Sequence, residues 1–187
     1  MSLVNMDLVL VKVFFSPAES GVYSLAQMIG KAFLYLPVAI SIVILPRASS
    51  LNAQNLDTRP ILKKSLLIAL LLCALAILIY NLFPYAVLRI LTGKTLPQSV
   101  FIGRLFSLSM TFYTLLYILI TYFLSIKDLR FIKILGTLTV FQLLGLVFFH
   151  QTLIQVQGVL CVSSFVLCAS HFYLLRKTPE LSSQRAR

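Results

Sequence analysis

The chain alternates long apolar segments with short polar ones, and this pattern predicts membrane-spanning helices. Residues 1–15 are apolar, but as a helix they would reach only about 22 Å, short of a hydrocarbon core of about 30 Å. Five longer apolar segments are suited to cross it: 22–45, 65–82, 100–124, 131–149 and 154–175. We therefore predict an all-α, polytopic transmembrane bundle over residues 1–177 with about six membrane-spanning helices. The first of these is expected to be truncated at its start, and residues 178–187 form a cytoplasmic tail.

The segments between the predicted spans hold the turn-forming and charged residues. They predict a turn at 16–20, loops on opposite sides of the membrane at 47–64 and 84–97, a short basic turn at 127–130 and an uncharged loop at 150–157. The tyrosines predict interfacial aromatic belts, with Tyr23, Tyr80 and Tyr85 at one surface and Tyr122 and Tyr173 at the other.

The 22–45 segment carries a polar stripe in an otherwise apolar sequence. Ser24, Gln27, Lys31 and Tyr35 recur at three- and four-residue spacing, so at about 100° per residue they share one helix face. A polar stripe within a membrane usually faces a partner helix or a water-filled cavity. These four residues are therefore candidate substrate-binding residues. Pro37, which lacks a backbone N–H donor, predicts a kink in the same helix.

The 100–124 segment carries a second polar stripe. Arg104, Ser107 and Thr111 lie on one side of this predicted helix, within about 100° of one another, and they are also candidate substrate-binding residues. Arg104 lies nearer the membrane surface than Lys31, so contact with lipid headgroups is the alternative for it. Both stripes contain a cation and therefore suit an anionic group.

Asp7 is the acid of the first apolar segment, where a lone carboxylate is costly. It could couple transport to an ion or a proton, or balance the charge of Lys31, unless it lies near the cytoplasmic surface. For Lys31 the sequence leaves two compatible interpretations open. It could line a cavity that holds an anion such as a pyrophosphate, or it could form a structural ion pair with Asp7.

Composition and charge support a membrane protein. Hydrophobic residues make up 59% of the chain and charged residues 11%, against about 45–50% and about 25% in soluble domains. The net charge of +11 would suit a nucleic-acid partner, but eleven of the sixteen Lys and Arg residues fall in segments assigned to one side: Arg47, Arg59, Lys63, Lys64, Lys127, Arg130, Lys133, Arg176, Lys177, Arg185 and Arg187. This positive-inside bias predicts a multi-pass protein of the cell membrane with both termini in the cytoplasm, and it argues against nucleic acid.

The sequence contains no pattern of a catalytic or metal-binding site. His150 and His171 are far apart in sequence, and neither belongs to a nucleophile, phosphate-loop or metal-ligand motif. We interpret His150 as a loop residue and His171 as a residue at headgroup level. The three cysteines, Cys73, Cys161 and Cys168, fall in apolar runs and are interpreted as small hydrophobic residues. We therefore expect no enzyme activity, no cofactor and no metal.

Several motifs in the first hundred residues resemble a known transporter family. They are Asp7, the run from Ser16 to Tyr23 (SPAESGVY), Gly30-Lys31, Pro37, Leu45-Pro46-Arg47, and Leu82-Phe83-Pro84 followed by Leu88 to Gly93 (LRILTG). In this order and spacing they are similar to the seventh, eighth and ninth helices of polysaccharide flippases. These proteins are the lipid-linked oligosaccharide exporters of the multidrug/oligosaccharidyl-lipid/polysaccharide (MOP) superfamily. Beyond these residues the resemblance is one of hydropathy alone.

The resemblance implies a MATE/MOP-like carboxy-terminal lobe that flips a lipid-linked oligosaccharide from the inner to the outer leaflet. In such transporters the binding site lies between two lobes that rock around it, and one lobe is absent here. The implied partners are membrane lipid, a lipid-linked glycan, and a missing amino-terminal lobe or a second copy of this chain. Two alternatives stay open: a drug or cation exporter of the same superfamily, and a small structural or accessory membrane protein.

Overall fold

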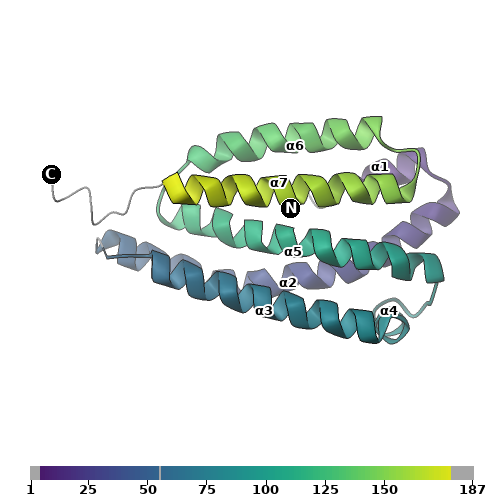
Figure 1. Cartoon of the computed structure of the whole chain (residues 1–187), viewed down its shortest axis with the longest axis horizontal. Coiled ribbons are helices and arrows are strands. Elements are labelled where there is room, and N and C mark those ends of the chain that lie inside the picture. Colours follow the sequence, from purple (N-terminus) through teal and green to yellow (C-terminus); the bar gives the residue numbers. More distant parts are fainter. Residues whose placement is uncertain (1–4, 55, 178–187) are drawn as a thin grey trace.

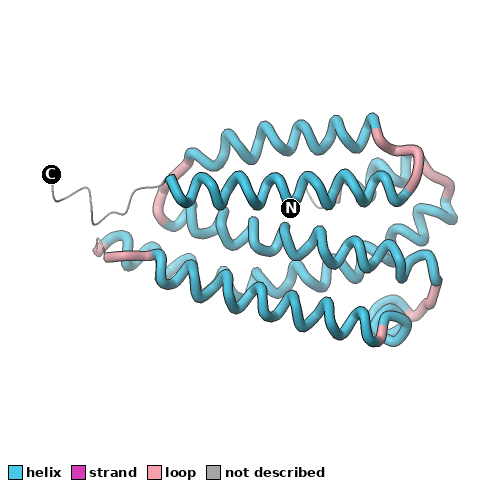
Figure 2. Tube along the Cα trace, in the orientation of Figure 1, coloured by secondary structure: helices cyan, strands magenta, loops and turns pink. Residues whose placement is uncertain are grey.

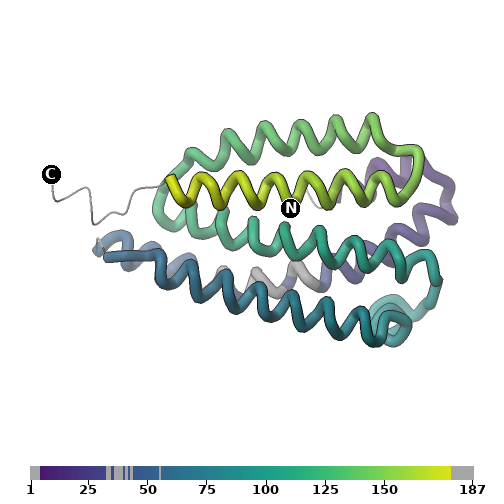
Figure 3. The backbone as a smooth tube through the Cα atoms, in the orientation of Figure 1, coloured from purple at the N-terminus to yellow at the C-terminus, as the bar shows by residue number. Residues whose placement is uncertain are grey.

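The structure is a computed structural model that describes residues 5–54 and 56–177, with only the backbone described for residues 33, 34, 36–39, 41 and 43 (Figure 3). The described residues form helices joined by short connections (Figure 2). The helices are α1 (Met6–Phe14), α2 (Pro17–Ala53), α3 (Arg59–Leu82), α4 (Pro84–Thr92), α5 (Pro97–Ser125), α6 (Arg130–Phe148) and α7 (Leu153–Lys177). The predicted all-α class is therefore confirmed, and the predicted tail at 178–187 lies outside the described residues.

Four of these helices, α3, α5, α6 and α7, are long and apolar enough to cross a membrane. The prediction of a helical membrane bundle is confirmed to this extent. The described part of α1 has nine residues, about 13 Å of helix. The 37-residue α2, about 55 Å long, contains the positions whose side chains are not described, Pro37 among them. The count of about six spans stays a prediction.

Helix α5 is the centre of the bundle, and it carries the second predicted polar stripe. The most apolar part of α5 is 67% buried, against 22% for α3 and 17% for α6. The long helices run side by side (Figure 1), with α5 packed against α2, α3 and α7, α6 against α7, and α1 against α2. Helices α3 and α6 therefore expose much of their apolar surface and are suited to face lipid.

The two ends of the bundle differ in the segments that they hold (Figure 1). At one end, which we call the α4 end, lie the α1–α2 turn, α4 and the α6–α7 connection. At the opposite end, the tail end, lie the α2–α3 and α5–α6 connections and the last turn of α7. The described basic segments that the sequence assigned to the cytoplasm thus gather at the tail end, and the side of the membrane that this end faces stays a prediction.

The predicted loop at 47–64 is wrong, because α2 continues to Ala53 and α3 already begins at Arg59. The sequence favoured an end at Pro46 because a proline lacks the N–H that continues a helix. Tertiary contacts outweigh this loss: Ile44 and Ala48 are fully buried, and the Ser49 hydroxyl donates to the carbonyl oxygen of Ser125 on α5 over 3.4 Å.

Helix α2 also begins earlier than predicted, so the turn at 16–20 is reduced to its first residue. Ser16 is the N-cap, and its hydroxyl accepts from the N–H of Glu19 over 3.3 Å while the Glu19 carboxylate accepts from the N–H of Ser16 over 3.1 Å. This reciprocal capping box satisfies two N–H groups that a helix start otherwise leaves unpaired. The hydrogen bonds from Ser16 lower the pKa of the Glu19 carboxyl.

The buried apolar side chains form two separate cores along the bundle. The α4-end core includes Val11, Ile29, Tyr80, Leu88 and Phe106, and the tail-end core includes Ile44, Leu62, Leu119, Phe123 and Phe131. Ile120 and Leu135, both partly buried, pack against both cores. Each end of the bundle is therefore held together by its own set of contacts.

We expect Gly103→Ala to destabilise the bundle by about 1–3 kcal/mol, because it overpacks the α4-end core. A β-carbon at Gly103 would lie 2.9 Å from Cδ1 of Ile29 and would overlap the Tyr80 hydroxyl. That hydroxyl is buried and donates to the carbonyl oxygen of Val100 over 3.1 Å, so it cannot move aside freely. Thermal unfolding in detergent measures the effect.

The matched control is Gly136→Ala on α6, where a β-carbon would meet nothing within 4 Å. Alanine has the higher helix propensity, so this variant should be at least as stable as the parent. Equal melting temperatures for both alanine variants would contradict the close packing of α2, α3 and α5 at Gly103.

Candidate functional site

The candidate site is a buried carboxylate between α1 and α2. Asp7 on α1 is fully buried. Its Oδ2 accepts a hydrogen bond from the Tyr23 hydroxyl over 2.8 Å, and its Oδ1 and Oδ2 accept from the Gln27 amide nitrogen over 3.1 and 3.3 Å. Both donors are neutral groups, so the carboxylate is solvated by the protein without being neutralised. We call Asp7, Tyr23 and Gln27 the carboxylate cluster.

Local structure places these three side chains together. Tyr23 and Gln27 are four residues apart on α2, so they lie on one helix face one turn apart. The Ser20 hydroxyl on α2 donates to the carbonyl oxygen of Val11 on α1 over 3.2 Å, which ties the two helices together beside the cluster. The Tyr23 ring packs edge-on against Phe106 of α5, with ring centroids 5.1 Å apart.

Further buried polar residues extend from the cluster toward α6 and α7. Tyr113 on α5 interacts electrostatically with Asp7, and its hydroxyl donates to Oε1 of Gln142 on α6 over 2.8 Å. Gln157 on α7 is fully buried and donates to the Ser109 hydroxyl over 2.9 Å, whereas its Oε1 has no hydrogen-bond partner among the described residues. These side chains form a polar interior within a mostly apolar helix bundle.

A buried carboxylate held by neutral donors can take up a proton or a cation. Lys31 attracts the Asp7 carboxylate electrostatically, but among the described residues the two side chains do not come within ion-pair distance, so the predicted structural ion pair is not closed in this conformation. A buried charge without an ion-pair partner in direct contact is costly. Binding of a positive species therefore lowers the free energy of this site, which is the property that ion coupling needs.

The predicted stripe of α2 does not lie in one environment. Gln27 is buried in the carboxylate cluster, whereas Ser24 and Lys31 are half-buried. The Ser24 hydroxyl donates to the carbonyl oxygen of Ser20 in its own helix over 2.7 Å. Tyr35 is 74% exposed, so it lies on the surface of this chain. Of the four residues, only Gln27 contacts Asp7.

The predicted stripe of α5 is similarly divided. Arg104 is exposed, whereas Ser107 and Thr111 are buried. The Ser107 hydroxyl donates to the carbonyl oxygen of Arg104 over 2.7 Å, and the Thr111 hydroxyl donates to that of Ser107 over 2.8 Å. Such bonds within one helix satisfy the hydroxyl without a ligand, and the Thr111 hydroxyl also interacts with the Cys73 thiol of α3. No hydrogen bond in the described part of the chain joins Arg104, Ser107 or Thr111 to the carboxylate cluster.

Three tyrosines that were predicted for interfacial belts are buried, so that prediction is wrong for them. Tyr23 holds Asp7, the Tyr80 hydroxyl donates to Val100, and the Tyr122 hydroxyl is 2.8 Å from that of Thr58. Each hydroxyl finds a partner inside the protein, which is what permits burial. Tyr85 and Tyr173 are exposed. The sequence did contain one indication that Tyr23 belongs to the site. Tyr23 lies four residues before Gln27 and therefore shares its helix face.

His171 was placed at headgroup level from the sequence, and this is wrong as well. Its side chain is fully buried, with the Phe123 and Phe131 ring centroids each 6.3 Å away. Nδ1 lies 2.8 Å from the carbonyl oxygen of Leu167, whereas the buried Nε2 has no hydrogen-bond partner among the described residues. His150 lies in the α6–α7 connection, as predicted, and stacks on Phe14.

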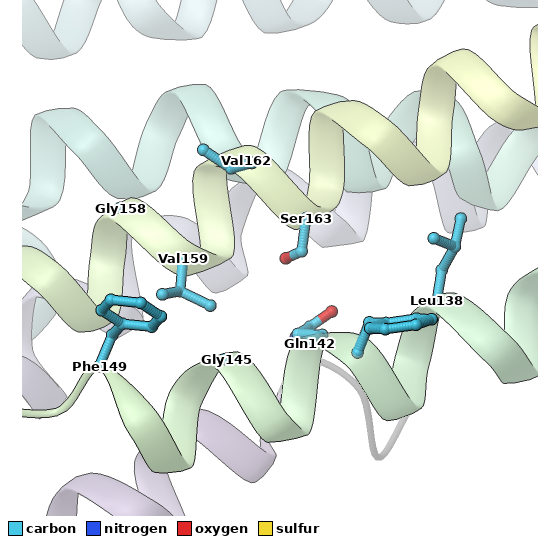
Figure 4. A pocket seen from close by; sticks show the side chains of 9 residues that line it. Leu138, Gln142, Gly145, Phe149, Gly158, Val159, Val162 and Ser163 are labelled. Atoms are coloured by element: carbon cyan, nitrogen blue, oxygen red, sulfur yellow. The ribbon is translucent and has the colours of Figure 1, made fainter.

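A cavity of about 440 Å³ lies between α6 and α7, apart from the predicted binding residues (Figure 4). Its walls are apolar except for Gln142 and Ser163, which point into it from the two helices (Figure 4). Gln142, a buried residue of α6, links this cavity to Tyr113 through the hydrogen bond described above. The cavity thus lies next to the polar interior, on the side toward the surface of the bundle.

Cysteine and metal chemistry add no second site. Cys73 and Cys168 are buried, Cys161 is half-buried, and all three are free thiols. Within residues 5–54 and 56–177, no three His, Cys, Asp or Glu side chains gather closely enough to hold a metal ion. The carboxylate cluster therefore remains the candidate functional site among the described residues.

Comparison with known proteins gives this site no precedent. No protein-family model, no curated protein and no solved structure matches the chain.

Proposed function

We propose that this chain is the carboxy-terminal half of a membrane transporter that flips a lipid-linked oligosaccharide or polysaccharide precursor across the cell membrane. The substrate class rests on the resemblance of its motifs to polysaccharide flippases of the MOP superfamily. The observation that carries a transport role is the carboxylate cluster, because a fully buried Asp7 with neutral donors is costly in a membrane bundle unless it has a function.

In this proposal Asp7 couples transport to a proton or another cation, and the cations of the two predicted stripes hold the anionic part of the substrate. Lys31 supports this role, since it is half-buried on α2, which also carries Gln27. Arg104 is exposed on α5, on a face that a second lobe or lipid headgroups would meet. Ser24, Tyr35, Ser107 and Thr111 are the remaining proposed contacts with the substrate.

The site argues for a partner lobe. A binding site between two lobes needs polar residues that one lobe leaves at its surface, and Tyr35 and Arg104 are such residues here. We propose that a separate amino-terminal lobe or a second copy of this chain supplies the opposite wall. By alternating access, the two lobes would open the site first to the cytoplasm and then to the outer leaflet.

Two other functions are favoured by particular observations. A drug or cation exporter of the same superfamily would use Asp7 itself to bind a cationic substrate, because the side chains that donate hydrogen bonds to its carboxylate, Tyr23 and Gln27, are neutral. A structural or accessory membrane protein fits the hydroxyls of Ser107 and Thr111, which bond within their own helix and offer little to a ligand.

We predict that the tail end of the bundle faces the cytoplasm, with both termini on that side. Reporter fusions after Gln54 and after Asp128 should report the cytoplasm, because the neighbouring segments carry the excess of basic residues. Fusions after Lys94 and after Thr152 should report the opposite side. A reversed signal from any of the four would break this topology.

The proposed function is tested by transport itself. Membrane vesicles that contain this chain together with its presumed amino-terminal lobe should move a labelled lipid-linked oligosaccharide to the far leaflet, and vesicles with either part alone should not. Single cysteines introduced at Ser24, Lys31 and Tyr35 and labelled with a water-soluble thiol reagent report whether these positions line a water-filled cavity, which separates the alternatives. Absence of transport together with unreactive positions at Ser24 and Lys31 would support an accessory protein, whereas export of a cationic drug by the same vesicles would support the drug exporter.

A further inference from the structure

Helix α4 differs from every other helix of the bundle in its direction. The long helices run along the horizontal axis of Figure 1, whereas α4 is seen almost end-on, so it crosses their direction. It follows α3 after the single residue Phe83, and it precedes α5 by a short connection. Since α3 and α5 are long and apolar enough to cross a membrane, a helix that crosses them at one end runs along the membrane surface.

This short helix is held firmly at both of its ends. Pro84 is its first residue, where a proline fits a helix start without loss of a hydrogen bond. At the other end Gly93 adopts a left-handed conformation with φ 71°, and its N–H donates to the carbonyl oxygen of Arg89 over 2.8 Å. The Thr92 hydroxyl also donates to the carbonyl oxygen of Leu88 over 2.7 Å. Local interactions therefore define both ends of this nine-residue helix.

The two sides of α4 meet different surroundings. Leu88 is fully buried in the α4-end core, whereas Ile90 is 83% exposed. Residues two apart on a helix point about 200° apart, so Ile90 lies on the side of α4 that faces away from the protein. Phe83 at the start of the helix is 63% exposed and Tyr85 is 53% exposed. An apolar surface of this kind next to membrane-spanning helices has lipid as its available partner.

The charges of this segment suit the same partner. Arg89 in the last turn of α4 and Lys94 just after it are both exposed. No Asp or Glu occurs anywhere from residue 58 to residue 127, so no acid nearby in the sequence neutralises them. Basic residues beside apolar ones are typical of helices that lie at the boundary between lipid headgroups and acyl chains.

We propose that α4 is an interfacial anchor that lies in the plane of the membrane surface. Its exposed apolar side chains, Ile90 and Phe83, enter the boundary between headgroups and acyl chains, and Arg89 and Lys94 contact the phosphate groups of phospholipids. An anchor at this point fixes the depth of the α3–α5 pair in the bilayer. This inference rests on the membrane bundle and is independent of the transported substrate.

Tryptophan fluorescence tests the proposal directly, because the chain contains no tryptophan. The full chain with Ile90→Trp is placed in phospholipid vesicles, with Leu71→Trp on α3 as a reference within the hydrocarbon core and Gln54→Trp as a reference in a polar connection. All three positions are exposed, so the substitutions should not disturb folding. Phe83→Trp provides a second reporter on the same surface.

A Trp at the interface should lie about 5–10 Å into the headgroup and acyl boundary. We therefore expect Ile90→Trp to be quenched about threefold less by aqueous acrylamide than Gln54→Trp, and most strongly by lipids brominated near the top of the acyl chain. Phe83→Trp should behave in the same way.

Two outcomes would overturn the anchor. Acrylamide quenching of Ile90→Trp equal to that of Gln54→Trp, with no quenching by brominated lipids, would place the exposed side of α4 in water. Strongest quenching by lipids brominated near the chain end, as expected for Leu71→Trp, would place α4 in the hydrocarbon core. If Ile90→Trp expresses poorly, Phe83→Trp decides by the same criteria.

Discussion

Asp7→Asn should leave the protein as abundant as the parent chain but reduce export by the assembled transporter at least about tenfold, if Asp7 couples transport to a cation. Asparagine has nearly the shape of aspartate, and its side-chain oxygen can still accept from the Tyr23 hydroxyl or the Gln27 amide. It cannot carry a negative charge or take up a proton. Export per molecule, measured in vesicles and divided by protein abundance, gives the result.

Tyr23→Phe is the matched control for this prediction. It removes one hydrogen bond to the carboxylate and keeps both the acid and the buried ring that packs on Phe106. Loss of a hydrogen bond to a charged group costs about 1.5–3 kcal/mol, so abundance should fall while export per molecule stays within about twofold. Normal export by Asp7→Asn protein would remove Asp7 from the transport cycle and leave the cluster as a structural feature.

Lys31→Ala should abolish export by the assembled transporter, whereas Lys31→Arg should retain much of it. If the lysine binds an anionic group such as a pyrophosphate, its positive charge is what the site needs, and arginine preserves that charge. Lys12→Ala is the control, because Lys12 is an exposed lysine on α1. It should export normally. Export and abundance must be measured separately for each variant.

The alternative role of Lys31 as a partner of Asp7 gives a different result. If the two residues neutralised each other, each single change would lower abundance, and Asp7→Asn combined with Lys31→Gln would restore it. The structure shows the Asp7 carboxylate bonded to Tyr23 and Gln27 instead, so we expect no rescue. Normal export by well-expressed Lys31→Ala protein would remove the lysine from the binding site.

The helices could be predicted from the sequence, but several of their ends could not. Apolar runs of twenty residues mark a membrane helix whatever its neighbours are, and α5, α6 and α7 begin and end within a few residues of prediction. The end of α2 depends instead on contacts that no local pattern contains, such as Ala48 buried against the tail-end core. Helix α4 itself was not predicted, because residues 84–97 were expected to form a loop; its Leu88 is buried in the α4-end core.

The candidate site was predicted in part. Asp7 and Gln27 were named from the sequence, because an acid and an amide in apolar helices are costly unless they have partners. Their direct contact was not predicted, since the opposite charge of Lys31 on the adjacent predicted helix made it the expected partner of Asp7. Tyr23 was missed because a tyrosine near a helix end fits a membrane interface equally well. The sequence likewise could not show that the hydroxyls on α5 donate hydrogen bonds within their own helix.

The two buried cores affect how the bundle could move. Regions with separate sets of apolar contacts tend to open as separate cooperative units, and here only partly buried residues such as Ile120 and Leu135 bridge them. We expect amide hydrogen exchange to protect the two halves of α5 to different degrees, with a step near Leu116–Ile118. A bundle built in this way could widen at one membrane face while its helices stay packed together at the other.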